Sequence, residues 1–108
     1  MSARRQELQA KLVDYYRSCG FKPRVAEDGT VRAAGLGGVT WIGLPILAED
    51  LGGLPQRLHE LSAERMPTGQ LCPLELLPEA GCEDEVRAVL RETRIADRRY
   101  VEVYSLAA

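Results

Sequence analysis

The sequence predicts an α+β fold in which one mixed sheet of five strands carries three packed helices, in the order α-β-β-β-α-β-α-β. Apolar residues recur at helical spacing in three segments, and runs rich in alternating or β-branched residues recur in five. A three-stranded meander followed by two strand–helix–strand crossovers accounts for this order. Since 108 residues is the size of one ordinary domain, residues 1–108 are expected to form a single domain.

The first helix is predicted over residues 3–19, where one face of the helix is apolar. Its stripe consists of Leu8, Leu12, Tyr15, Tyr16 and Cys19. Most of the charged residues in this segment fall off the stripe. Gly20 is expected to end the helix, because glycine readily adopts the left-handed conformation found after a last helical turn.

A β-hairpin is predicted over residues 22–34. The dipeptide Asp28-Gly29 is typical of a two-residue type I′ turn, in which both residues have positive φ. A strict two-residue loop would set Val25 opposite Arg32. A slip of one residue would exchange the two faces of each strand, so the register of this hairpin stays open.

The third strand is predicted over residues 39–44. Its apolar side chains alternate between two faces, with Val39 and Trp41 on one and Ile42 and Leu44 on the other. This pattern is expected of a strand that is covered, at least in part, on both faces. Pro45 is expected to end the strand, because it has no N–H to donate.

Helix and strand alternate over the rest of the chain. A helix is predicted over residues 55–65, a strand over 71–77, a helix over 83–93 and a last strand over 100–106. Pro73 weakens the fourth strand or places it at an edge of the sheet.

Composition and charge narrow the possible functions. Fourteen Lys and Arg against sixteen Asp and Glu give a net charge of -2, whereas a nucleic-acid-binding domain is usually basic. No apolar run approaches the 18 residues of a membrane span, and the amino-terminal residues lack the apolar core of a signal peptide. Three cysteines, an odd number, argue against a disulfide framework. The cytoplasm is therefore the expected location.

No sequence motif brings a nucleophile, a base and an orienting group together. The glycine-rich segment 35–38 lacks the lysine of a phosphate-binding loop and precedes a strand, so a bend between strands is expected there. His59 is the only histidine, and no Gly-x-Ser-x-Gly elbow occurs. The sequence favours a binding protein over an enzyme, and it predicts no catalytic residue, cofactor or metal.

A second hypothesis is a thiol- or metal-dependent protein that uses Cys72 and Cys82 with His59. Nine residues separate the two cysteines, whereas structural zinc sites usually contain close cysteine pairs. Cys82 precedes a predicted helix whose dipole favours a thiolate, but the three acidic residues that follow oppose that charge. Cys19 and Cys72 are expected to be small core residues.

The side chains expected to bind a partner or ligand are aromatic or cationic: Trp41, Tyr100, Tyr104, Arg98 and Arg99. Tyr100 and Tyr104 share one face of the last strand with Glu102, which forms either an interaction surface or core beneath the first helix. The two arginines form either an anion pocket or a solvated turn. The sequence therefore predicts a small cytoplasmic binding or regulatory protein that docks a protein partner or a small ligand. A homodimer that covers an edge strand is also expected.

Overall fold

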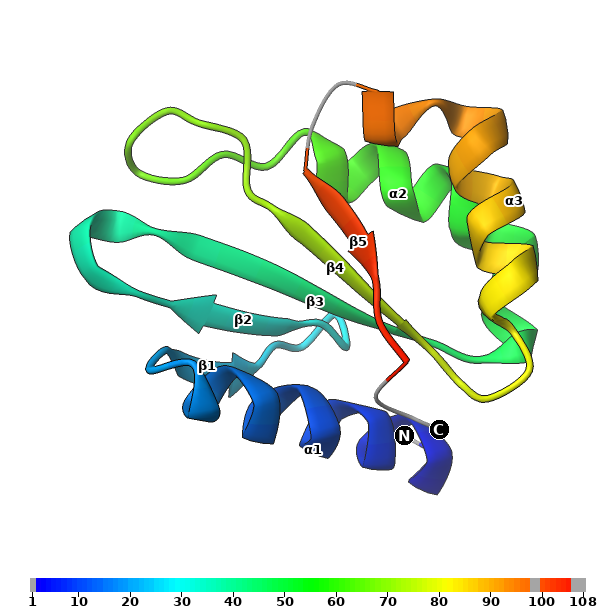
Figure 1. Ribbon diagram of the computed structural model, residues 1–108, viewed down its shortest axis with the longest axis horizontal. Coiled ribbons are helices and arrows are strands. Elements are labelled where there is room, and N and C mark those ends of the chain that lie inside the picture. Colours follow the sequence, from blue (N-terminus) through cyan, green and yellow to red (C-terminus); the bar gives the residue numbers. More distant parts are fainter. Residues whose placement is uncertain (1, 98–99, 106–108) are drawn as a thin grey trace.

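In the computed structural model, the chain forms a five-stranded mixed sheet with helices on both faces (Figure 1). The structure describes residues 2–97 and 100–105. The predicted element order is confirmed, and the elements are α1 (Ala3–Ser18), β1 (Lys22–Val25), β2 (Val31–Ala34), β3 (Thr40–Ile46), α2 (Leu54–Ser62), β4 (Leu74–Pro78), α3 (Glu83–Thr93) and β5 (Val101–Val103). No helix in this part of the chain is long and apolar enough to cross a membrane.

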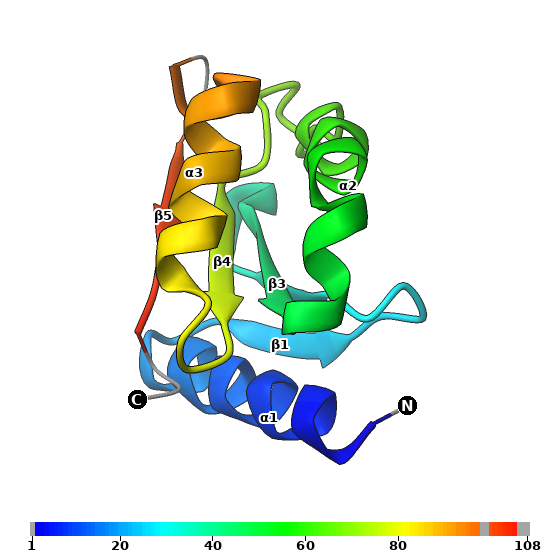
Figure 2. The ribbon, with the colours of Figure 1, turned by 90° about the vertical axis from the view of Figure 1, so that its right-hand side faces the viewer.

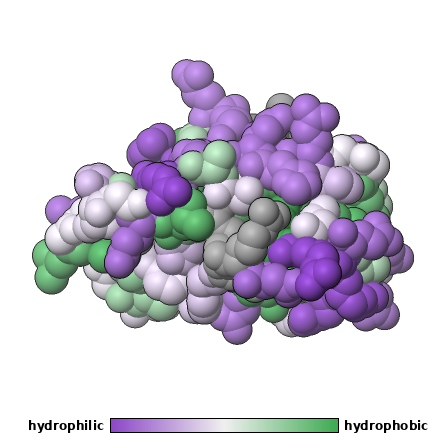
Figure 3. Space-filling view, turned by 90° about the horizontal axis from the view of Figure 1, so that it is seen from above, coloured by the Kyte–Doolittle hydropathy of each residue, from purple (hydrophilic) through white to green (hydrophobic). Residues whose placement is uncertain are grey.

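The strands lie side by side in chain order, from β1 at one edge to β5 at the other. The first three are antiparallel to their neighbours, and β4 and β5 run parallel to β3. Helix α1 packs on one face, chiefly over β1, β2 and β3, while α2 and α3 lie next to each other on the opposite face (Figure 2). Hydrophilic side chains cover most of the surface seen from above α2 and α3 (Figure 3).

The sheet separates two hydrophobic clusters. One lies beneath α2 and α3 and includes Ile42, Leu58 and Leu74, whereas the other lies beneath α1 and includes Leu12 and Val31. Because successive side chains of a strand point to opposite faces, β3 and β4 contribute to both clusters. The predicted cover on both faces of the third strand is therefore confirmed.

The turn between β1 and β2 differs from the expected type I′ turn. Val25 pairs with Val31, and the Ala26 N–H donates to the Thr30 carbonyl oxygen. The turn between the strands therefore contains the three residues 27–29. Gly29 has a φ of 88°, but Asp28 does not share the positive φ that a type I′ turn requires. The Asp28 carboxylate instead accepts a hydrogen bond of 3.0 Å from the backbone N–H two residues further on, and this bond stabilises the turn.

Two prolines occupy positions that differ from those predicted. Pro45 lies inside β3, because β2 pairs with β3 only as far as Gly43. The N–H of Ile42 points toward β4, and N–H groups alternate in direction along a strand, so the nitrogen of Pro45 points to the β2 side of β3. The pairing with β2 ends at Gly43, so no hydrogen bond between the strands requires an N–H at Pro45. Pro73 precedes β4, which is a central strand and not an edge strand.

The cysteines divide by burial. Cys72 is buried, as predicted, but Cys19 is exposed at the carboxyl end of α1. The core position predicted for Cys19 is therefore wrong. Its side chain borders a cavity at this end of the helix, where the sheet does not cover it.

Candidate functional site

A cavity of about 340 Å³ lies between the carboxyl half of α1 and the sheet. Every aromatic residue of the chain lines it: one tryptophan, one phenylalanine and four tyrosines. Its lining residues are Tyr15, Tyr16, Cys19, Phe21, Trp41, Glu75, Tyr100, Glu102 and Tyr104, and we call this cavity the aromatic pocket. Its volume lies within the usual range for small-molecule sites.

Four parts of the fold supply the rings, and Phe21 comes from the connection between α1 and β1. Tyr15 and Tyr16 come from the last turns of α1, and Trp41 comes from β3. The two other tyrosines flank β5, whose carboxyl end approaches the carboxyl end of α1 (Figure 2). Tyr16 is only 1% exposed and reaches over Gly43 of β3. A side chain at Gly43 would lie 3.0 Å from the Tyr16 hydroxyl, so the missing side chain is what admits this ring.

The six rings form one continuous chain of contacts. Their centroids are 5.1 Å apart for Tyr104–Tyr15, 5.6 Å for Tyr15–Tyr16, 6.4 Å for Tyr16–Phe21, 6.0 Å for Phe21–Trp41 and 5.3 Å for Trp41–Tyr100. All five separations are typical of favourable aromatic pairs. The chain of rings begins and ends at residues that flank β5, so the rings surround the pocket.

A buried carboxylate belongs to this ring of aromatic side chains. Glu75 of the central strand β4 is 1% exposed, and its register neighbours are Gly43 on β3 and Glu102 on β5. The Tyr104 hydroxyl donates a hydrogen bond to Glu75 Oε2, whereas Oε1 has no partner among the described residues. Gly43 has no side chain and Glu102 carries the same charge, so neither neighbour neutralises Glu75.

Burial is the main cause of a raised pKa at Glu75. The nearby Tyr16 hydroxyl opposes this effect, and the negative charge of Glu102 adds to it. Burial also raises the pKa of Tyr15 to about 12, and the hydrogen bond that Tyr100 donates to Glu102 raises the pKa of Tyr100 to about 12. Both hydroxyls are therefore neutral hydrogen-bond donors at pH 7.

Two further buried polar atoms of the pocket lack a hydrogen-bond partner in residues 2–97 and 100–105: the Tyr16 hydroxyl and Trp41 Nε1. With Glu75 Oε1 they include a donor, an acceptor and a group that can serve as either. In this part of the chain, all three buried side-chain atoms without a partner belong to residues that line the same cavity. Leaving one such group unsatisfied costs about 1–3 kcal/mol.

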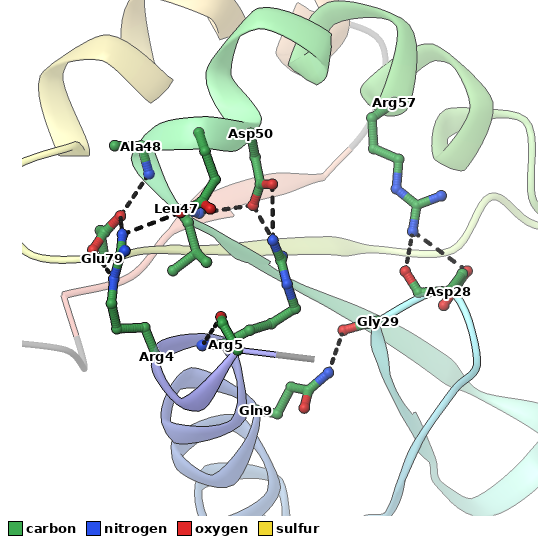
Figure 4. A network of polar contacts seen from close by, with 12 residues as sticks. Arg4, Arg5, Gln9, Asp28, Gly29, Leu47, Ala48, Asp50, Arg57 and Glu79 are labelled. Atoms are coloured by element: carbon green, nitrogen blue, oxygen red, sulfur yellow. Dashed lines mark hydrogen bonds and ion pairs between the residues drawn. The ribbon is translucent and has the colours of Figure 1, made fainter.

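The opposite end of α1 borders a larger cavity of about 610 Å³, where several of the charged lining residues form ion pairs (Figure 4). Arg5 makes a bidentate contact with Asp50, at 2.9 and 2.8 Å. Arg57 lies 3.6 Å from the Asp28 carboxylate and also donates to the Asp28 carbonyl oxygen at 2.8 Å. These contacts join α1, the β1–β2 turn and the segment before α2, so they explain how this end is held together.

Next to the same cavity, Arg4 contacts Glu79 at 2.6 Å, and Glu79 accepts a hydrogen bond from the Ala48 N–H at 2.5 Å. We call the contacts of Arg4 and Arg5 with Glu79 and Asp50 the arginine clasp (Figure 4). The hydrogen bond from Arg4 stabilises the ionised form of Glu79 and so lowers the pKa of this carboxyl.

Three of the predicted binding residues, Trp41, Tyr100 and Tyr104, come together in the aromatic pocket. Arg98 and Arg99 lie outside the described residues. The sequence pattern places Tyr16 on the apolar stripe of the first predicted helix, and alternation in the fourth predicted strand places Glu75 on the face opposite Leu74 and Leu76. It does not assign either residue to a site, because the strand order that joins them is not visible in the sequence.

The residues of the second hypothesis occupy separate elements. His59 lies on α2, Cys72 precedes β4, and Cys82 caps the amino end of α3. The described part of the chain contains no group of three or more His, Cys, Asp or Glu side chains that could hold a metal ion. Burial, reinforced by neighbouring glutamates, raises the pKa of Cys82, which disfavours its thiolate.

No family model, curated protein or solved structure matches this chain. The fold and the site together define an α+β protein with a ring of aromatic side chains around a buried carboxylate.

Proposed function

We propose that this chain is a small-ligand-binding protein, and that the aromatic pocket is its binding site. The observation that carries the proposal is the gathering of every aromatic side chain with three buried polar atoms that have no hydrogen-bond partner among the described residues. Buried polar groups in folded proteins are nearly always hydrogen-bonded. A ligand with an apolar body and polar substituents would supply the missing partners while its body contacts the rings.

The hydroxyl groups of the pocket favour binding over chemistry. The pKa values of Tyr15 and Tyr100 are raised to about 12, so these two hydroxyls stay neutral and do not act as nucleophiles near neutral pH. Tyr100 is 48% exposed and lies at the margin of the pocket, whereas Tyr16 and Glu75 are buried. This gradient of exposure supports a ligand that enters past Tyr100 and reaches inward.

The proposal includes the cytoplasmic location and the regulatory role expected from the sequence, with ligand occupancy as the regulatory variable. The homodimer stays a prediction of its own. Strands β1 and β5 end the sheet, so self-association would add a strand at one of these edges. Size-exclusion chromatography with light scattering measures this directly, and a mass of one chain at all concentrations would exclude the dimer.

Trp41 provides the test of the proposed function, because it is the only tryptophan of the chain. A library of small aromatic fragments is screened by NMR, with the Trp41 indole N–H as the probe. We expect saturable shifts of this one resonance, together with a change in tryptophan fluorescence. Fragments that bind only at the cavity of the arginine clasp, and leave the indole resonance unchanged, would refute the proposal.

A further inference from the structure

We infer that the ligand of the aromatic pocket is a protonated amine that carries at least one N–H, held between the Glu75 carboxylate and the surrounding rings. This inference rests on the proposed function, because it identifies the chemical class of the ligand for the same pocket.

The charge of the pocket is the first argument. Glu75 and Glu102 occupy neighbouring register positions on parallel strands and point to the same face. No lysine or arginine lines the pocket in the part of the chain that the structure describes. Two carboxylates side by side repel each other, and the repulsion is stronger where one of them is out of water. A cation placed between them removes this repulsion.

The aromatic lining is the second argument. The faces of aromatic rings carry negative potential and attract cations, with tryptophan the strongest of the three ring types. Six rings in continuous contact around one carboxylate therefore form an environment that suits a compact organic cation. A bare metal ion is a poorer fit, because among the described lining residues the side-chain oxygens are two carboxylates and four phenol groups spread over several elements.

The unpartnered atoms define the kind of cation. Glu75 Oε1 accepts no hydrogen bond within the described residues, although Oε2 of the same group is satisfied by Tyr104. A primary or secondary ammonium has an N–H that can donate to Oε1, whereas a quaternary ammonium has none. The unpartnered N–H of Trp41 favours amines that also bear a hydroxyl or carbonyl oxygen.

The affinity for such an amine is expected to depend on pH with a defined sign. Binding requires an ionised Glu75, so affinity rises with pH through the raised pKa of Glu75 and then becomes constant. The other titratable groups that line the pocket are Glu102, Cys19, Tyr15, Tyr16, Tyr100 and Tyr104. The pKa values of Tyr15, Tyr16 and Tyr100 are raised, so these hydroxyls stay neutral over the range in which Glu75 ionises.

Three matched probes test the inference: benzylammonium, its neutral counterpart benzyl alcohol, and benzyltrimethylammonium, which lacks an N–H. Their affinities for the wild-type chain are measured by calorimetry and by Trp41 fluorescence. We expect benzylammonium to bind about tenfold or more tighter than benzyl alcohol, because a charged hydrogen bond and cation–π attraction add to the same ring contacts. Benzyltrimethylammonium is expected to be intermediate.

Glu75→Gln removes the charge with little change of shape and is expected to reduce the difference between benzylammonium and benzyl alcohol to about twofold or less. Glu79→Gln, at the arginine clasp, is the matched control and should leave that difference intact. Equal binding of benzylammonium and benzyl alcohol to the wild-type chain would overturn the inference while the proposed function survives. If neither these probes nor neutral fragments shift the Trp41 resonance, both proposals fail. The wild-type comparison decides the matter even if the Glu75 variant does not fold.

Discussion

The two ends of α1 meet the rest of the molecule in opposite ways. At the amino end, Arg5 and Asp50 form a bidentate pair, and Arg4 is paired with Glu79. At the carboxyl end, the more deeply buried Glu75 accepts a hydrogen bond from a tyrosine hydroxyl and pairs with no cation within residues 2–97 and 100–105, and a like-charged Glu102 lies beside it. The fold thus neutralises carboxylates beside this helix at one end, whereas among the residues that the structure describes no cation contacts the carboxylate inside the aromatic pocket.

The pKa values of the carboxyl groups at the two ends of α1 shift in opposite directions. Paired charges at the amino end lower the pKa of Asp50 through the Arg5 contact despite partial burial, whereas burial raises the pKa of Glu75 at the other end. A carboxylate with a lowered pKa adds stability to the folded state, and one with a raised pKa subtracts from it. The cost at Glu75 is what a cationic ligand would recover.

The largest expected effect comes from filling the space above Gly43. Gly43→Ala places a methyl group 3.0 Å from the Tyr16 hydroxyl and 3.1 Å from a methyl of Leu12, so these side chains must shift. We expect a loss of about 1–3 kcal/mol in the free energy of unfolding, measured in urea, together with weaker ligand binding.

Gly53→Ala is the matched control, since nothing lies within 4 Å of an added methyl there and its φ of -97° suits any residue. It is expected to change stability by less than about 1 kcal/mol. A Gly43→Ala variant as stable as this control would show that Tyr16 does not depend on the gap above β3.

Breaking the arginine clasp is expected to have the next largest effect. Arg5→Ala removes both bonds to Asp50 and leaves that carboxylate with its backbone contact to Leu47. Because the pair is part-exposed and screened by solvent, we expect a loss of about 1 kcal/mol in the free energy of unfolding. Arg17→Ala, at an exposed position of the same helix, should change it by less than about 0.5 kcal/mol. If Arg5→Ala and Arg17→Ala lose equal amounts of unfolding free energy, the arginine clasp does not stabilise the fold as described.

Removing the Glu75 charge at the carboxyl end of α1 should stabilise the protein, in contrast to breaking the arginine clasp. Glu75→Gln is expected to raise the free energy of unfolding at pH 7 by about 1 kcal/mol, because the ionised carboxyl is disfavoured in the folded state. Its folded pKa lies above its unfolded value, so the wild-type chain loses stability as pH rises from the unfolded pKa through the folded pKa. The gain should therefore vanish when urea unfolding is repeated below about pH 4, where Glu75 is protonated in both states. A gain that persists in acid would point to packing and not to charge.

The smallest effect is expected at the β1–β2 turn in acid. Burial acts to raise the pKa of Asp28, but hydrogen bonds from Thr30 and Arg32 lower it to about 2. Its stabilising contribution is thus complete above the ordinary aspartate pKa and is lost as pH falls toward 2. Wild-type stability should decline over this window, and the decline should be shallower in Asp28→Asn. Identical slopes in thermal unfolding between pH 4 and 2 would contradict this assignment.

The sequence predicts the fold better than the site. Helical spacing identifies α1, and alternation identifies both faces of β3 and β4, because these patterns are local. Two predictions about prolines are wrong: Pro45 does not end the third strand, and Pro73 does not place the fourth strand at an edge. Both depend on tertiary structure, namely where β2 stops pairing with β3 and where β4 begins relative to Pro73.

The aromatic pocket depends even more on long-range contacts. Trp41, Tyr100 and Tyr104 were predicted as binding residues because aromatic side chains concentrate at binding surfaces. Glu75 was visible only as a polar residue in an apolar strand. A glutamate at the centre of such a strand, opposite a strand position held by glycine, is the pattern that would have drawn attention to it. That pairing of Glu75 with Gly43 requires the register of β3 and β4.

The pKa of the Glu75 carboxyl can be followed by carbon-detected NMR with and without benzylammonium. We expect a value above the ordinary glutamate range in the free protein and a lower value on saturation with the amine, because the bound cation stabilises the ionised form. A pKa that is ordinary in the free protein, or that does not change when the amine is bound, would contradict the account.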